Sequence, residues 1–253
     1  MRAPAAHAPR MPALAVTRTE TRWNVTFANP PVNLVDPEMI LELQALVDQL
    51  EHDPEVTVVV FDSADADHFL GPYDMSRAAD TPSIPGPTGL PTWLDLTVRL
   101  SRLPVVSIAV IRGASRGVGQ EFALACDLRF ASLEHTAIDQ PEVGHRLVPG
   151  GGAIARLPAL VGRARALELI LGSVVLDAAT AERYGVVNRA LPDAELDEYV
   201  DELASELAGL DRRVLAEAKA LIDRATLPAD ADLVNAYEAF FASAGRLTTG
   251  VAR

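Results

Sequence analysis

Cysteine and lysine are almost absent from this chain of 253 residues. Cys126 is the single cysteine, which excludes an internal disulfide framework and favours a reducing compartment. Lys219 is the single lysine, so a mechanism that requires a lysine has one candidate. Acidic residues outnumber basic ones, 35 to 22, and the formal net charge of −13 argues against nucleic acid or an anionic membrane surface as a partner.

Long hydrophobic runs are also missing. The most apolar stretch, residues 104–111, is interrupted by Arg112 and Gly113, and is too short for a membrane span. Residues 1–13 lack the apolar centre of a signal peptide, and we expect a disordered tail there. With 49% hydrophobic residues the chain can bury a sizeable core, and the sequence predicts a cytoplasmic protein with no membrane contact.

Strand and helix signals alternate through the first part of the chain. Alternating residues over 14–28 predict a hairpin, and Asp36 followed by Pro37 predicts the start of a helix. Further patterns predict strands over 56–61, from 105, at 128–132 and at 186–190. They also predict helices over 92–102, near 163–171 with an end at Gly172, and from Asp177 to Gly185. The proline-rich residues 80–91 are expected to form a loop that could act as a lid.

From Leu196 onward the apolar spacing is helical only, and three successive helices are expected. The chain is therefore predicted to be an α/β core over residues 14–195 with an all-helical segment over 196–253. The apolar content of that segment suggests a role in self-association.

The glycine-rich stretch "GASRGVG", residues 113–119, has three possible interpretations. It is similar to the turn with which short-chain dehydrogenases hold a dinucleotide pyrophosphate. Such a turn normally follows the first strand, whereas here more than 100 residues precede it. The Tyr-x-x-x-Lys pair of those enzymes is also absent, because Leu215 stands four residues before Lys219. This interpretation remains only as an outside alternative.

"GASRG" also satisfies the G-x-S-x-G pattern of the α/β-hydrolases, with Ser115 as nucleophile. That chemistry needs an acid and then a histidine delivered by later strands. His135, Asp139 and His145 all follow within about 30 residues of the serine, and no histidine comes after His145. A serine in a tight polar turn is the simpler explanation.

The third interpretation is a turn that directs backbone N–H groups at a thioester oxygen, with Glu121 beside it. It rests on three separated motifs: "PVVSIAVIRGASRGVGQEFALACDLRFAS", "QPEVGHRLVPGGGAIARLPALVGRARALELIL" and "LDAATAERYGVVNRALP". Together they resemble the enoyl-CoA hydratase/isomerase (crotonase) superfamily, and the likeness continues more faintly through "HFLGPYDM". The resemblance implies a crotonase-like spiral of ββα units.

The resemblance also implies a set of site residues. It places two oxyanion-stabilising backbone N–H groups at Tyr73 and Val118, and two catalytic carboxyl groups at Glu121 and Glu142, which suit the addition of water to a 2-enoyl-CoA thioester. Further substrate-binding residues would be Phe69, Leu70, Gly71, Asp74, Gly117, Gly119 and His145. No metal site and no cofactor are implied, because coenzyme A arrives as part of the substrate.

Taken singly, several of these residues have simpler explanations. Glu121 is typical of an acid in a first helical turn and Glu142 of a solvated loop. Asp74 can fix its own loop by hydrogen bonding, and Cys126 suits a small buried position. The glycines of "PGGG" at 149–152 could accept an anion or permit tight packing.

Departures from the family pattern leave the reaction open. Pro72, Tyr73 and Val118 stand where small residues are common, and Asp67 and Ser76 where basic residues often grip CoA, with only Arg77 nearby. We expect a hydratase, which is a carbon–oxygen lyase, assembled as a homotrimer or homohexamer. Isomerisation, decarboxylation, thioester hydrolysis and a non-catalytic acyl-CoA-binding or partner-binding role are the alternatives.

Overall fold

The computed structural model of this chain describes residues 11–82 and 84–248. The strands are β1 (Leu14–Arg18), β2 (Arg22–Phe27), β3 (Val58–Ser63), β4 (His68–Leu70), β5 (Val106–Ile111), β6 (Ala114–Arg116), β7 (Leu128–Ser132), β8 (Ala137–Asp139), β9 (Leu176–Asp177) and β10 (Arg189–Leu191). The α-helices are α1 (Pro37–His52), α2 (Thr92–Arg102), α3 (Val118–Ala125), α4 (Ala153–Gly172), α5 (Ala178–Tyr184), α6 (Asp193–Ala208), α7 (Arg212–Thr226) and α8 (Asp230–Thr248), and η1 (Met75–Asp80) and η2 (Val143–His145) are 3₁₀ turns.

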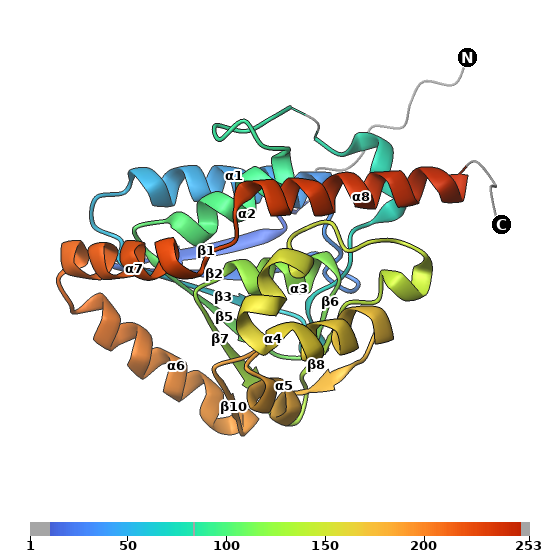
Figure 1. Cartoon of the computed structure of the whole chain (residues 1–253). Coiled ribbons are helices and arrows are strands. Elements are labelled where there is room, and N and C mark those ends of the chain that lie inside the picture. Colours follow the sequence, from blue (N-terminus) through green and yellow to red (C-terminus); the bar gives the residue numbers. More distant parts are fainter. Residues whose placement is uncertain (1–10, 83, 249–253) are drawn as a thin grey trace, which may run out of the picture.

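Two sheets alternate along the chain. Strands β1, β2, β3, β5, β7 and β10 form the larger sheet in that order, and β4, β6, β8 and β9 form the smaller one. Each of the pairs β3–β4, β5–β6 and β7–β8 gives one strand to each sheet before the chain enters α2, α3 or α4. The predicted spiral of ββα units is therefore confirmed (Figure 1).

Local sequence signals explain most of these elements. The predicted hairpin forms, with β1 antiparallel to β2, and the next strands of the larger sheet pair in parallel. Asp36 caps α1 by accepting a hydrogen bond from the Met39 N–H at 2.9 Å. Asp177 caps α5 in the same way through Thr180 at 2.7 Å, and Gly185 ends that helix in the left-handed region.

The glycine-rich stretch departs from the simple turn that its sequence suggests. Residues Ala114–Arg116 form β6, which pairs in parallel with β4 and with β8 before α3 begins at Val118. Helix α4 likewise starts at Ala153, earlier than predicted, and is bent at Gly162, whose φ is 78°. The sequence predicted the second half of α4 and its end at Gly172, but a strand of three residues and the part of α4 before the bend carry too little periodicity to be predicted.

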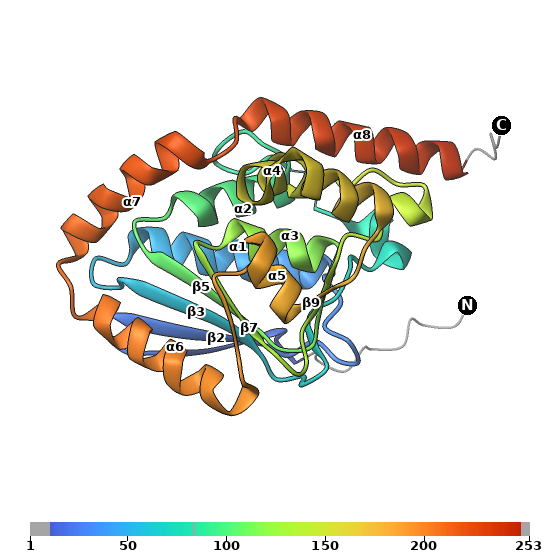
Figure 2. The same ribbon diagram turned by 60° about the horizontal axis from the view of Figure 1, so that its bottom comes forward.

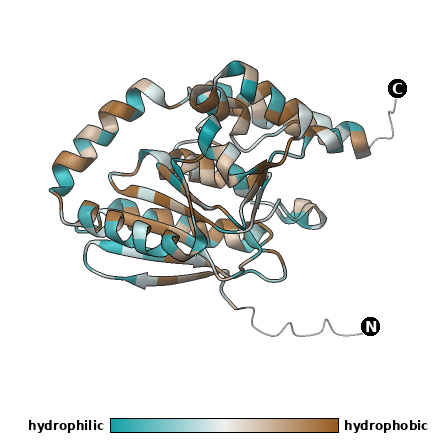
Figure 3. Cartoon of the chain, turned by 90° about the horizontal axis from the view of Figure 1, so that it is seen from below, coloured by the Kyte–Doolittle hydropathy of each residue, from teal (hydrophilic) through white to brown (hydrophobic). Residues whose placement is uncertain are grey.

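The larger sheet is covered on both faces. Helices α1, α2 and α3 lie on one side and α6 on the other (Figure 2). The alternation along β3 explains both layers, since Val59 and Phe61 join the core beneath the first three helices, whereas Val58 and Val60 pack against α6. In Figure 3 the helices around the rim alternate between hydrophobic and hydrophilic colours, as amphipathic helices should.

The three C-terminal helices have different surroundings. Helix α6 begins at Asp193, slightly before the predicted segment start, and α7 is anchored by Lys219, whose Nζ lies 3.0 Å from Asp127 Oδ1. No residue of α7 is buried. Helix α8 returns across the molecule to lie along α4 and α2 (Figure 1).

Residues 1–10 of the predicted tail lie outside the described residues, while Ala13 is buried and its N–H donates to Glu42 at 3.2 Å. Within residues 11–82 and 84–248, none of the helices combines the length and apolarity needed to cross a membrane.

Candidate active site

The start of α3 packs directly against the end of β4. A Cβ atom on Gly119 would lie 2.2 Å from the carbonyl oxygen of Leu70, so only glycine allows this approach. Gly117, immediately before the helix, has φ +54° and ψ −123°, a backbone conformation that L side chains rarely adopt. The glycine pattern therefore brings the N-terminus of α3 beside the loop that follows β4.

That loop carries Tyr73, the first predicted oxyanion donor. Val35 and Tyr73 form a parallel bridge in which the Val35 N–H donates to Pro72 O at 3.1 Å and the Asp74 N–H donates to Val35 O at 2.9 Å. In such a bridge the N–H of the central residue, Tyr73, points to the opposite side. Val118, the first residue of α3, has an N–H with no acceptor inside its helix. Two backbone donors thus lie on neighbouring segments.

Glu121 lies one turn into α3 and is 2% exposed. Its Oε1 accepts hydrogen bonds from the N–H groups of Gly151 at 2.8 Å and Ala153 at 3.1 Å. Burial and, after it, the nearby charge of Glu142 together raise the pKa of Glu121 to about 8, although the two backbone donors oppose the rise. At neutral pH this carboxyl group can therefore exist in either protonation state.

Glu142 belongs to the segment that follows β8. A Cβ atom on Gly117 would lie 2.8 Å from Glu142 Oε1 and 3.6 Å from Pro72 Cβ, so the carboxyl group sits against both donor-bearing segments. Its Oε2 is buried without a hydrogen-bond partner among the described residues. Burial raises the pKa of Glu142 to about 7, with a contribution from the charge of Asp139. The solvated-loop explanation does not describe this side chain.

The "PGGG" segment supplies both features that its sequence suggested. Its amides hold a carboxylate, that of Glu121, and its glycines permit close packing, because a Cβ on Gly151 would lie 2.2 Å from Glu121 Oε2 and 2.6 Å from Trp93 Nε1. The indole N–H of Trp93 donates to Gly151 O at 3.2 Å. Sequence reasoning had not singled out Trp93 or linked this segment to Glu121, since the contact spans 30 residues.

Arg156 is a second residue that the sequence analysis missed. It is 5% exposed, and its guanidinium donates to Ser101 Oγ at 3.0 Å and Thr97 O at 3.3 Å. Burial lowers its pKa to about 10, so it remains a cation, and its charge favours the ionised form of Glu121. Its place on an apolar helical pattern gave no signal of this role.

The other predicted substrate-binding residues divide into two groups. Phe69 and Leu70 are fully buried, and Gly71 donates its N–H to Asn33 O at 2.9 Å, so their side-chain positions face the protein interior. Asp74 caps η1 by accepting from the Ser76 N–H at 3.0 Å, as its loop-fixing explanation predicts. His145 is exposed at the end of η2. Its role as a substrate-binding residue stays a prediction.

Arg77, the basic residue nearest the Tyr73 loop, is already paired. Its guanidinium bonds Glu38 at 2.9 Å and Asp80 at 2.7 Å. Tyr73 itself directs its hydroxyl to Thr81 Oγ1 at 2.5 Å, and burial raises the pKa of its phenol. The side chains around this loop are thus engaged with one another.

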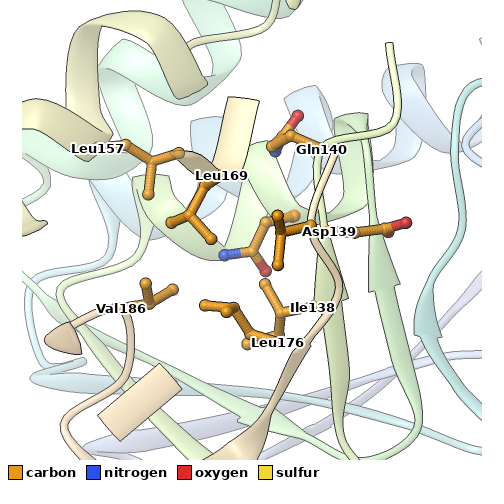
Figure 4. Close-up of a pocket in the computed structure, with 9 residues that line it drawn as sticks. Ile138, Asp139, Gln140, Leu157, Leu169, Leu176 and Val186 are labelled. Carbon is orange, nitrogen blue, oxygen red and sulfur yellow. The ribbon is translucent and has the colours of Figure 1, made fainter. Parts of the chain in front are cut away.

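A small cavity of about 10 Å³ is lined by residues of α3, β8, α4 and β9 (Figure 4). Leu157, Leu169, Leu176 and Val186 surround it, and Asp139 directs its carboxylate away, to Arg116. The cavity has room for about one water molecule, so it is too small for an acyl group.

The described part of the chain holds no cluster of three or more His, Cys, Asp or Glu side chains that could bind a metal ion. Cys126, predicted to be a small buried residue, is 4% exposed.

The two-sheet spiral of ββα units defines a fold of the crotonase type. The sequence profile of the enoyl-CoA hydratase/isomerase family matches residues 18–246, and the chain belongs to that family. A curated relative, the short-chain-enoyl-CoA hydratase of Clostridium acetobutylicum, is 30% identical over 215 residues, covering 85% of this chain and 82% of the relative.

Solved structures of similar proteins support the same family assignment. A candidate enoyl-CoA hydratase from Streptomyces avermitilis is 40% identical, with a TM-score of 0.87 over 98% of this chain and 94% of that one. An enoyl-CoA hydratase from Mycobacterium avium subsp. paratuberculosis is 27% identical, with a TM-score of 0.79 over 93% of this chain and 90% of that one. The family assignment thus rests on both sequence and structure.

Proposed function

We propose that this enzyme adds water across the 2,3 double bond of a 2-enoyl-CoA thioester with a short acyl group. The observation that carries the proposal is a pair of carboxyl groups, that of buried Glu121 and that of half-buried Glu142, whose pKa values are raised to about 8 and about 7. General acid–base catalysis works best when the pKa of the catalytic group lies near the working pH. The name of the Clostridium acetobutylicum relative supports both the reaction and the short chain.

In this mechanism the two carboxyl groups divide the proton transfers. Glu121, in its ionised form, holds the water and removes its proton as the oxygen bonds to C3. Glu142, in its protonated form, delivers a proton to C2, so that one water is added in total. The charge of Arg156 favours ionised Glu121, but the pKa of Glu121, about 8, lies above that of Glu142, about 7, so the state with the proton on Glu142 is the minor one of the pair before substrate binds.

The enolate that forms between these steps carries negative charge on the thioester oxygen. We propose that the N–H groups of Tyr73 and Val118 stabilise it, helped by the positive end of the α3 dipole. Removing one such donor typically costs about 3 kcal/mol of transition-state stabilisation. No separate cofactor takes part, because coenzyme A is the substrate's own handle.

We further propose that the chain works as a homotrimer or homohexamer. Val214, Leu221 and Ile222 of α7 have exposed fractions of 63%, 63% and 62%, and apolar residues at this spacing on one helix favour burial against another copy. Light scattering tests this proposal, and a monomer at micromolar concentration would contradict it.

The experiment that tests the reaction follows the conjugated-enoyl absorbance of 2-enoyl-CoA thioesters with acyl chains of increasing length. Wild type should turn over the shortest members fastest. Glu121→Gln and Glu142→Gln should each lower kcat by about 10²–10⁴-fold, because each removes one proton-transfer group. Glu198→Gln is the matched control, since Glu198 is exposed on α6, outside the predicted site, and should leave kcat unchanged.

Failure of wild type to consume any enoyl-CoA would refute the hydratase assignment. Migration of the double bond, loss of CO₂ or release of free coenzyme A, each measured in the same samples, would point to the corresponding alternative reaction. Binding of acyl-CoA with none of these products would indicate a non-catalytic role.

A further inference from the structure

The segment between η2 and α4 has two faces. Gly151 and Ala153 donate their N–H groups to Glu121, at 2.8 and 3.1 Å. The neighbouring residues Val148, Gly150 and Gly152 contact α8 instead. One strip of backbone therefore connects the Glu121 carboxyl group to the last helix.

Helix α8 contacts this segment over three of its turns. Ser243 Oγ accepts a hydrogen bond from the Val148 N–H at 3.1 Å. A Cβ on Gly150 would lie 2.5 Å from Phe240 Cβ, and a Cβ on Gly152 would lie 3.6 Å from Leu233 Cδ2. Spacings of seven and three residues place these α8 side chains on one face of the helix.

The segment has little of its own with which to hold its position. Gly150 and Gly151 lack side chains, and the Gly151 peptide is fixed by contacts on both sides, with Trp93 on its carbonyl and Glu121 on its N–H. On the outer side the contact comes from α8, where Ser243 is 2% exposed. A displacement of α8 would therefore change the donor distance at Glu121.

We propose that Phe240 and Ser243 are positioning residues that hold the Gly151 amide on Glu121. They do not touch the reacting atoms; they act through the segment 148–152. The inference rests on the proposed function in assigning Glu121 a part in catalysis. It also gives the C-terminal helical segment a role in the site of its own chain, in addition to the self-association predicted from its sequence.

The kinetic test uses Phe240→Leu and the milder Ser243→Ala, with Phe241→Leu as matched control. Phe241 is the adjacent residue of the same helix and is 51% exposed. Phe240→Leu and Ser243→Ala should lower kcat about tenfold while KM stays within about twofold, because geometry and not binding is lost. Ser243→Thr, which keeps the hydroxyl, should restore most of the rate.

The pH profile separates positioning from a merely structural effect. A weakened Gly151 donor stabilises the carboxylate less, so the acid limb of kcat/KM should move to higher pH in Phe240→Leu and Ser243→Ala and stay in place in Phe241→Leu. The proposal would be overturned if kcat and the acid limb of kcat/KM in Phe240→Leu and Ser243→Ala were equal to those of Phe241→Leu.

Amide hydrogen exchange tests the same inference without any substrate. Exchange over residues 147–153 should become faster in Phe240→Leu and Ser243→Ala, while β5 keeps its wild-type protection. Unchanged exchange over 147–153 in both variants would overturn the positioning role. Absence of turnover in wild type would instead defeat the proposed function, so the two failures are distinguishable.

Discussion

The layer between the larger sheet and α6 is purely apolar, whereas the layer on the opposite face buries charges. Val58, Val60, Ile108, Val110 and Phe130 meet α6, and none of them carries a polar side-chain atom. On the other face Glu121 and Arg156 are 2% and 5% exposed. The apolar layer can contribute only stability, while the charged one gives up some stability to hold groups that can exchange protons.

Among the substitutions that test this difference between the two layers, Phe130→Ala should have the largest effect on stability. Phe130 is 3% exposed and packs edge-on against Tyr199 at 5.3 Å. Its loss leaves a cavity, and the free energy of unfolding should fall by about 3–5 kcal/mol in urea denaturation. Well below the transition, kcat should match wild type, and a folded but inactive variant would contradict the separation of the two layers.

Glu121→Gln should have the opposite effect on stability at alkaline pH. The folded-state pKa of Glu121 is raised from 4.5 to about 8, so its contribution to stability is fully present below pH 4.5 and is lost as the pH rises to about 8. Glutamine cannot ionise, so the variant should be more stable than wild type at pH 9 by a few kcal/mol.

At pH 4.5 that difference should nearly vanish, although kcat remains low throughout. Thermal unfolding of both proteins at the two pH values gives the measurement. Equal differences at both pH values would mean that the carboxyl group is not held in a high-pKa environment.

Gly151→Ala should cost less stability but still affect the site. The new methyl group would overlap Glu121 Oε2 and Trp93 Nε1, which are both buried, and overpacking of this kind typically costs about 1–3 kcal/mol. We expect at least a tenfold loss of kcat, because Glu121 must move. A wild-type kcat in Gly151→Ala would show that the segment 148–152 can shift to accommodate the methyl group without displacing the Glu121 carboxyl group.

Gly245→Ala, within α8, should produce the smallest change. A Cβ there would meet no atom within 4 Å, and alanine favours a helix over glycine by about 0.5–1 kcal/mol. A small rise in the midpoint of thermal unfolding, with unchanged kcat, is the expected outcome. A fall in the midpoint of thermal unfolding would indicate that α8 packs against another molecule at this position.

The sequence predicted most of the larger sheet, since β1, β2, β3, β5 and β7 carry strong local patterns, and α2 was placed at its observed bounds. The strands of the smaller sheet were mostly missed. β4, β6 and β8 have three residues each and β9 has two, which is too short for an alternation to show.

The two carboxyl groups of the site were predicted from the family resemblance, but their environment was not. Contacts such as Gly151 with Glu121 and Ser243 with Val148 join residues 30 and 95 positions apart, and no local pattern records such distances. For His145 the sequence allowed either a pocket or the surface, and the turn η2 leaves its side chain exposed.

The isolation of Cys126 has a practical consequence. It is the single thiol of the chain, it is 4% exposed, and burial raises its pKa well above the usual range, so it should resist alkylating reagents. A cysteine introduced at an exposed position of α8 would then be the one reactive thiol. A spin label or dye attached there would report the mobility and surroundings of that helix during turnover, without a signal from a second labelled thiol.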